Sequence, residues 1–197
     1  MTTREPAASA ASRDDASPAS ETLEARSARL LSTLAATFAG TVPNIYRMLA
    51  DNPAVLESFV TQERLLEQDG VLSHSEQAVV ALIVASHSQC RYCQAVFAKE
   101  VEAHGISTHV RRTIQHGKLP RDRRLAALAH ATRRTLASHG RLGRAEIGAL
   151  ERRGLTWPEL LEITAIIAAY TLATYANNLA RTRVDPEFAP APGPAAG

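Results

Sequence analysis

The 197-residue chain contains little cysteine and almost no lysine, and its charges nearly cancel. Two cysteines cannot staple a secreted disulfide scaffold, and they cannot form a four-cysteine zinc site by themselves. The basic side chains are almost all arginine, because Lys99 and Lys118 are the only lysines. The net charge of +2 is too small to indicate a polyanionic partner. The sequence thus lacks the marks of a small secreted protein and of a self-contained zinc domain.

Long apolar runs are also absent. The longest uncharged stretch, residues 163–180, is interrupted by three threonines and two asparagines, so we interpret it as a buried helix of a soluble protein rather than a membrane span. The first 21 residues contain no apolar run and include Asp14 and Asp15, so we expect no signal peptide and a cytoplasmic location. In that compartment a cysteine pair is more often redox-active or metal-binding than structural.

The middle of the chain has the composition of a globular domain, with 45% hydrophobic and 21% charged residues. Its apolar residues recur every three or four positions, as in the face formed by Leu125, Leu128 and Thr132, and no segment alternates with a period of two. We therefore predict an all-α fold. Proline, alanine, serine and glycine enrich both ends, so we predict disordered tails at residues 1–22 and 189–197 and one helical domain at 23–188.

Capping and stop signals divide this domain into separate helices. In the first half we predict a helix from Leu30 to a stop at Gly40, one that begins at Pro43-Asn44, one from Asn52-Pro53 to near Gly70, and one capped by Ser73 and Glu76. In the second half we predict helices from Cys90 to Gly105, over residues 125–136, from Ala145 to Arg153, and from Trp157-Pro158 onward.

The candidate chemistry lies at Cys90 and Cys93, at the predicted start of a helix. Two thiols three residues apart can form a disulfide, and the positive end of the helix lowers a thiol's pKa there. The resulting thiolate can attack a peroxide oxygen or a disulfide sulfur, and the second thiol then resolves the product. A metal site would need two more ligands, of which His87 could supply one, and an inert pair is the third alternative.

A thiol peroxidase also needs groups that move protons. His87 could lie over the thiols if the chain turns sharply at Ser88, or it could cap the last turn of its own helix. Glu76 is more simply the capping-box partner of Ser73, and His104 lies too far along the helix from Cys93 for direct action. We therefore take Cys90, Cys93 and His87 as the candidate catalytic residues, with no cofactor-binding or metal-binding residue assigned.

These motifs resemble the carboxymuconolactone decarboxylase and alkyl hydroperoxidase D-like family over roughly residues 38–188. The resemblance rests on Val42-Pro43-Asn44-Ile45-Tyr46 with Asn52-Pro53, on residues 72–93, on residues 124–129, 154–156 and 159–162, on Tyr175-Ala176-Asn177-Asn178, and on Val184-Asp185-Pro186. It implies a compact all-α bundle that forms a homo-oligomer. It further implies that Cys90 and Cys93 cycle between dithiol and disulfide, with Cys93 the peroxide-reactive thiol, Cys90 its resolving partner, and a lipoyl-bearing protein as reductant.

The chain departs from the hydroperoxidase pattern at two positions. A glutamate and a histidine of that pattern are replaced here by Ala78 and Phe97, which cannot transfer a proton. The loss predicts a slow peroxidase, since acid–base assistance is worth about 10² to 10⁴-fold in rate. We therefore expect an antioxidant-type thiol oxidoreductase that reduces hydroperoxides or a disulfide with a lipoyl- or thioredoxin-like dithiol donor. The alternatives are a non-catalytic or redox-sensing oligomer of the same fold and, ranked below both, a lactone decarboxylase.

Residues 111–153 carry twelve arginine or lysine residues against three acidic ones, a net charge of +9. Such a surface is typical of nucleic-acid binding. Here, however, the arginines flank apolar helical stripes, as on the solvated faces of surface helices, and aromatic residues are nearly absent. We expect this segment to attract an acidic carrier protein or an anionic substrate rather than nucleic acid.

Overall fold

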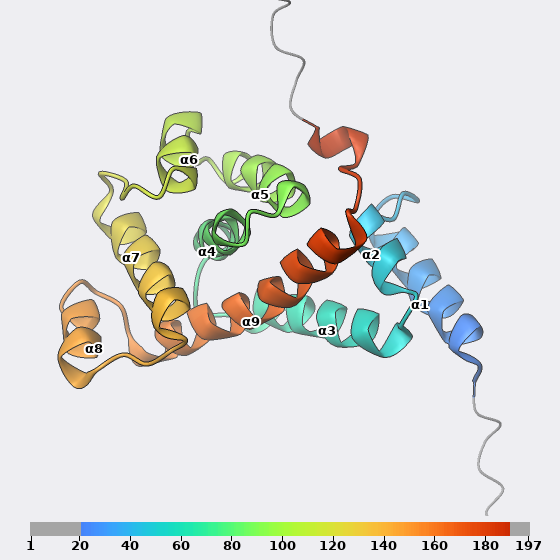
Figure 1. Cartoon of the computed structure of the whole chain (residues 1–197), viewed down its shortest axis with the longest axis horizontal. Coiled ribbons are helices and arrows are strands. Elements are labelled where there is room, and N and C mark those ends of the chain that lie inside the picture. Colours follow the sequence, from blue (N-terminus) through green and yellow to red (C-terminus); the bar gives the residue numbers. More distant parts are fainter. Residues whose placement is uncertain (1–20, 190–197) are drawn as a thin grey trace, which may run out of the picture.

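A computed structural model describes residues 21–189 as a bundle of helices (Figure 1). Every regular element in that range is helical, which confirms the predicted all-α fold. The predicted disordered tails lie almost wholly outside the described residues. The elements are α1 (Leu23–Thr37), α2 (Asn44–Leu49), α3 (Pro53–Asp69), α4 (His74–His87), α5 (Arg91–Ala103), α6 (Thr108–Gln115), α7 (Arg123–Ser138), α8 (Arg144–Glu151), α9 (Trp157–Ala180) and a 3-10 turn, η1 (Pro186–Phe188).

Helix α4 forms the centre of the bundle. All eight residues from Ala78 to Ala85 are buried, so this helix is apolar on every side and has to be enclosed by its neighbours. Helices α5, α7 and α9 pack around it (Figure 1), and α6 covers part of the remaining surface. The enclosed position of α4 fixes where its C-terminal end, and therefore the cysteine pair that follows, lies within the core.

Helix α9 crosses the bundle beside α3, and it contacts α4, α5 and α7 as well (Figure 1). By length and composition alone it could cross a membrane, and it is the one helix among residues 21–189 for which that holds. Ile163, Ile166 and Ala173 are nonetheless buried against neighbouring helices, as in a core helix of a soluble protein. The predicted helix over residues 163–180 is confirmed, but it is buried along one face only, because Tyr175 and Leu179 are exposed.

Capping boxes fix the starts of α4 and α9, and one arginine joins them. Glu76 accepts a hydrogen bond from the backbone N–H of Ser73, as predicted, and Glu159 does the same for Thr156. Arg124 at the start of α7 donates to both glutamates, with N–O distances of 2.5 Å. Burial raises the pKa of Glu76, but the hydrogen bonds from Arg124 and Ser73 outweigh it, so this pKa is lowered overall. Glu76 is thus committed to the scaffold and not to the thiols.

Helix α6 was not among the predicted helices. It begins after the N-cap Ser107 and carries two arginines, and Ile114 is its single buried residue. Its eight residues contain only two apolar side chains, Val110 and Ile114, which is too short a pattern to identify a helix from the sequence.

Candidate active site

The cysteine pair lies at the junction of α4 and α5, where the chain makes a sharp turn. Gln89 has a φ of 51°, a left-handed conformation that a side chain disfavours, and the Cys90 N–H donates back to the Ala85 carbonyl at 3.0 Å. Cys90 is then the N-cap of α5, and its Sγ accepts a hydrogen bond from the Cys93 N–H at 3.4 Å. Both cysteines are free thiols and both are buried.

This position makes the two thiols unequal. The adjacent Cys93 thiol lowers the pKa of Cys90 to about 7, and the Cys93 and Tyr92 backbone N–H groups act in the same direction against the effect of burial. The Cys90 sulfur and burial together raise the pKa of Cys93, which the side chain of Asn177 partly offsets. The pair therefore carries one negative charge near neutral pH, because Cys90 loses its proton before Cys93 does.

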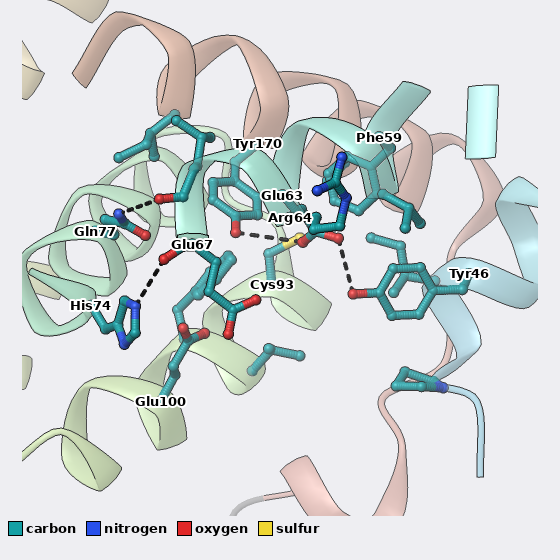
Figure 2. A pocket seen from close by; sticks show the side chains of 18 of the residues that line it. Tyr46, Phe59, Glu63, Arg64, Glu67, His74, Gln77, Cys93, Glu100 and Tyr170 are labelled. Carbon is teal, nitrogen blue, oxygen red and sulfur yellow. Dashed lines mark hydrogen bonds between the residues drawn. The ribbon is translucent and has the colours of Figure 1, made fainter. Parts of the chain in front are cut away.

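Cys93 lines a cavity of about 740 Å³, whereas Cys90 does not (Figure 2). Helices α1, α2, α3, α5 and α9 supply most of the wall, and Phe188 of η1 closes part of it. Aromatic rings form a continuous group across the cavity: Phe97 and Tyr170 meet edge to face with centroids 4.7 Å apart, and Phe59 lies 6.1 Å from Tyr170. A molecule bound in this cavity would reach Cys93 first.

A carboxyl group faces the same cavity. Glu63 of α3 accepts hydrogen bonds from the Tyr46 hydroxyl at 3.0 Å and from the Tyr170 hydroxyl at 3.5 Å (Figure 2). Burial raises the pKa of Glu63 to about 8, with a further contribution from the nearby Glu100 carboxylate, although the two tyrosine hydroxyls lower it. At neutral pH this carboxyl is mostly protonated and can donate a proton into the cavity.

Two further glutamates line the cavity. Glu100 of α5 is partly buried, and burial together with repulsion from Glu67 raises its pKa to about 7. Glu67 and His74 are exposed, and the His74 ring bonds the Glu67 carbonyl oxygen at 3.0 Å (Figure 2). The cavity therefore combines an apolar, aromatic wall with the carboxyl groups of Glu63 and Glu100, which are partly uncharged near pH 7.

The segment after α9 is tied to the site through Tyr92. The Tyr92 hydroxyl donates to Asp185 Oδ2 at 2.6 Å, and Asp185 also accepts from the Asn44 backbone N–H. Asp185 is 5% exposed, so this anchor lies within the core. It joins the starts of α2 and α5 to the chain that leads into η1. Because Tyr92 directly precedes Cys93, this anchor also holds the backbone next to the cysteine.

The structure brings Cys90 and Cys93 together, but it places His87 elsewhere. His87 ends α4 with an exposed side chain and is absent from the cavity wall, so its catalytic role stays a prediction. Ala78 is buried inside α4, and Phe97 lies on the cavity wall. Among residues 21–189, no three histidine, cysteine or acidic side chains are grouped in a way that could hold a metal ion.

Sequence reasoning missed Glu63, Tyr46, Tyr170 and Asn177. Glu63 falls on the apolar face of α3, four residues after Phe59 and three before Leu66. A charged residue on such a face is costly to bury without a reason, so its position was a usable signal. Its tyrosine partners come from α2 and α9, 17 and 107 residues away, and only the folded chain reveals them.

Solved structures of similar fold support the resemblance seen in the sequence. An uncharacterized peroxidase-related protein from Ralstonia eutropha JMP134, described as an alkylhydroperoxidase AhpD core, matches with a TM-score of 0.69 and 26% identity over 82% of this chain and 85% of that chain. An uncharacterized peroxidase-related protein from Silicibacter sp. TM1040 matches with a TM-score of 0.68 and 19% identity, over 82% and 86%. The debrominase Bmp8, in a cysteine-to-alanine variant bound to 2,3,4-tribromopyrrole, matches with a TM-score of 0.65 and 16% identity. The match covers 81% of this chain and 87% of that chain.

No protein-family model matches the sequence, and no curated protein does. The fold is nevertheless that of the alkyl hydroperoxidase D-like proteins, with a Cys-x-x-Cys pair at the start of a helix. These structures support the resemblance of the sequence to the carboxymuconolactone decarboxylase and alkyl hydroperoxidase D-like family.

Proposed function

We propose that this protein is a thiol oxidoreductase of peroxidase type, which reduces an organic hydroperoxide or a disulfide through Cys90 and Cys93. The main support is the position of Cys93 on the wall of a cavity that also contains the protonated carboxyl of Glu63. Nucleophilic sulfur and a proton donor facing one cavity are the two groups that cleavage of an O–O bond requires.

In the first step the Cys93 proton passes to the Cys90 thiolate, and the Cys93 sulfur attacks the outer oxygen of the hydroperoxide. The O–O bond breaks, Cys93 becomes a sulfenic acid, and the alkoxide leaves as an alcohol with the proton of Glu63. The Cys90 sulfur then attacks the Cys93 sulfur, forming the disulfide, and the hydroxide released takes the Cys90 proton and leaves as water. A dithiol donor returns two electrons and two protons.

The cavity favours a substrate with an apolar body. Its volume is about 740 Å³, within the range of sites for drug-sized molecules, and aromatic rings form much of its wall. The Glu63 carboxyl, which is mostly protonated at neutral pH, adds no full negative charge to this wall. We therefore propose uncharged organic hydroperoxides as the preferred class, with a lipoyl- or thioredoxin-like dithiol donor in the cytoplasm as the reductant.

The test is peroxide consumption with cumene hydroperoxide and dihydrolipoamide, measured from pH 5 to 10. The rate should rise through about pH 7, as the thiol pair loses its first proton, and fall through about pH 8, as Glu63 loses its own. Cys93→Ser should abolish turnover, whereas Cys90→Ser should still form a sulfenic acid at Cys93. A protein that consumes no peroxide at any pH would refute the enzymatic proposal.

A redox-sensing role without turnover is the second candidate. Both thiols are about 1–2% exposed, and a large dithiol donor cannot reach them without some opening of the fold. A sensor would form the Cys90–Cys93 disulfide once with peroxide but would not be reduced rapidly by dihydrolipoamide. Rapid re-reduction by that donor therefore favours the enzyme over the sensor.

A further inference from the structure

One buried amide contacts the reacting sulfur directly. Asn177 of α9 donates from its side-chain Nδ2 to Cys93 Sγ at 3.3 Å, and the residue is 2% exposed. The bond joins residues 84 positions apart, so it depends on the packing of α9 against α5. A donor at this distance interacts more strongly with a thiolate than with a thiol.

The rest of the Asn177 side chain has no structural partner. Its Oδ1 is buried and accepts no hydrogen bond from any described residue. Its α9 neighbours Ala173 and Thr174 are also buried, so an apolar side chain would suit this position better for stability alone. An amide that leaves one buried polar atom unsatisfied, and directs the other at a reactive sulfur, indicates a chemical role.

The neighbouring Asn178 shows what a structural amide looks like on the same helix. It is exposed, and its Nδ2 donates to the Ser88 carbonyl oxygen at 3.0 Å, which holds the turn before the cysteines. Two consecutive side chains of α9 therefore reach the same segment, one contacting its backbone and the other its sulfur.

We propose that Asn177 is a further catalytic residue, whose amide stabilises negative charge on Cys93, the sulfur that faces the cavity, in competition with Cys90. The inference rests on the proposed function, in which Cys93 is the attacking thiol. The singly charged pair has two proton arrangements: the backbone N–H groups at the start of α5 favour charge on Cys90, and Asn177 favours charge on Cys93. Attack proceeds from the second arrangement, with the proton held on Cys90.

The titratable groups that act on Cys93 are Cys90, from the same helix turn, and Tyr92, whose hydroxyl is bound to Asp185. Replacing Cys90 by serine removes the main competitor and isolates the Asn177 contribution. In this Cys90→Ser background, the rate of alkylation by iodoacetamide as a function of pH gives the pKa of the Cys93 thiol directly.

Asn177→Leu in that background should raise the pKa of Cys93 by about one unit, which is a tenfold loss of thiolate below the pKa. Asn177→Ala should do the same, and it carries the test if the leucine variant does not fold. Asn178→Ala, the matched control, should leave the pKa of Cys93 unchanged. An unchanged pKa in a folded Asn177 variant, or an equal shift in the Asn178 control, would overturn the role of Asn177.

The assay contains no peroxide, so its failure is separate from that of the proposed function. A raised pKa of Cys93 in protein that never consumes peroxide supports the role of Asn177 and refutes the peroxidase proposal. An unchanged pKa in protein that turns peroxide over refutes the role of Asn177 alone.

Discussion

Replacing Glu63 by glutamine should stabilise the protein near neutral pH and slow peroxide turnover at the same time. The variant keeps the shape of the side chain and an oxygen that can accept from the Tyr46 hydroxyl, but it removes the proton that leaves on ionisation. A residue kept for packing would lose stability on replacement and would leave the chemistry unchanged. The two readouts together therefore separate a catalytic carboxyl from a structural one.

The size of the stability effect follows from the pKa of Glu63. Burial raises this pKa from 4.5 to about 8, so the folded state holds the proton more tightly than the unfolded state. Stability from this group is complete below about pH 4.5 and is lost as the pH rises towards 8. Between pH 4.5 and pH 7, a span of about 2.5 pH units, the free energy of unfolding falls by about 3 kcal/mol because of this group. Glu63→Gln removes this pH-dependent loss.

Urea unfolding at pH 5 and pH 7.5 measures the effect. The free energy of unfolding of Glu63→Gln, relative to the unmodified protein, should rise by about 2 to 3 kcal/mol between the two pH values. Peroxide turnover should fall by about 10² to 10⁴-fold. Glu24→Gln, which changes an exposed carboxyl of α1 outside the cavity, is the control and should change neither quantity much. Parallel pH curves for the two proteins, with unchanged turnover, would refute the assignment of Glu63.

Two further predictions concern groups outside the cavity. His87→Ala tests the catalytic role predicted for His87 from the sequence. Because His87 is exposed, we expect a smaller fall in peroxide rate than for Glu63→Gln. An unchanged rate and an unchanged thiol pH profile would show that His87 takes no part in the reaction. Tyr175 and Leu179 are 65% and 89% exposed on α9, so we expect them to be covered in a homo-oligomer. Light scattering should show a mass above 21.2 kDa that falls in Tyr175→Glu/Leu179→Glu, and a purely monomeric native protein would contradict this.

The helical fold could be predicted from the sequence because its signals are local. The capping box of Ser73 and Glu76 and the Asn52-Pro53 start both lie where the structure begins a helix. The long apolar stretch after Trp157 could be assigned to a buried helix for the same reason. Helix α6 could not be assigned, since Ile114 is its single buried residue and Val110 is its only other apolar residue.

The site could be predicted only where it is contiguous in sequence. Cys90 and Cys93 form a motif, and the N-cap position of Cys90 follows from the helix start. Glu63 and Asn177 form hydrogen bonds with partners on other helices, and no local spacing connects them with the cysteines. Ala78 and Phe97 predict from the sequence that the proton relay is lost. The folded chain nevertheless places another carboxyl, that of Glu63, on the wall of the cavity that Cys93 lines.

The proposed function requires that peroxide oxidise Cys90 and Cys93 to a reversible disulfide. Titration of the reduced protein with one equivalent of cumene hydroperoxide, followed by mass spectrometry of the peptide that contains both cysteines, tests it most directly. We predict loss of two hydrogen masses in that single peptide, restored by dihydrolipoamide. A stable sulfinic or sulfonic acid on either cysteine without a disulfide, or no mass change at all, would contradict the claim.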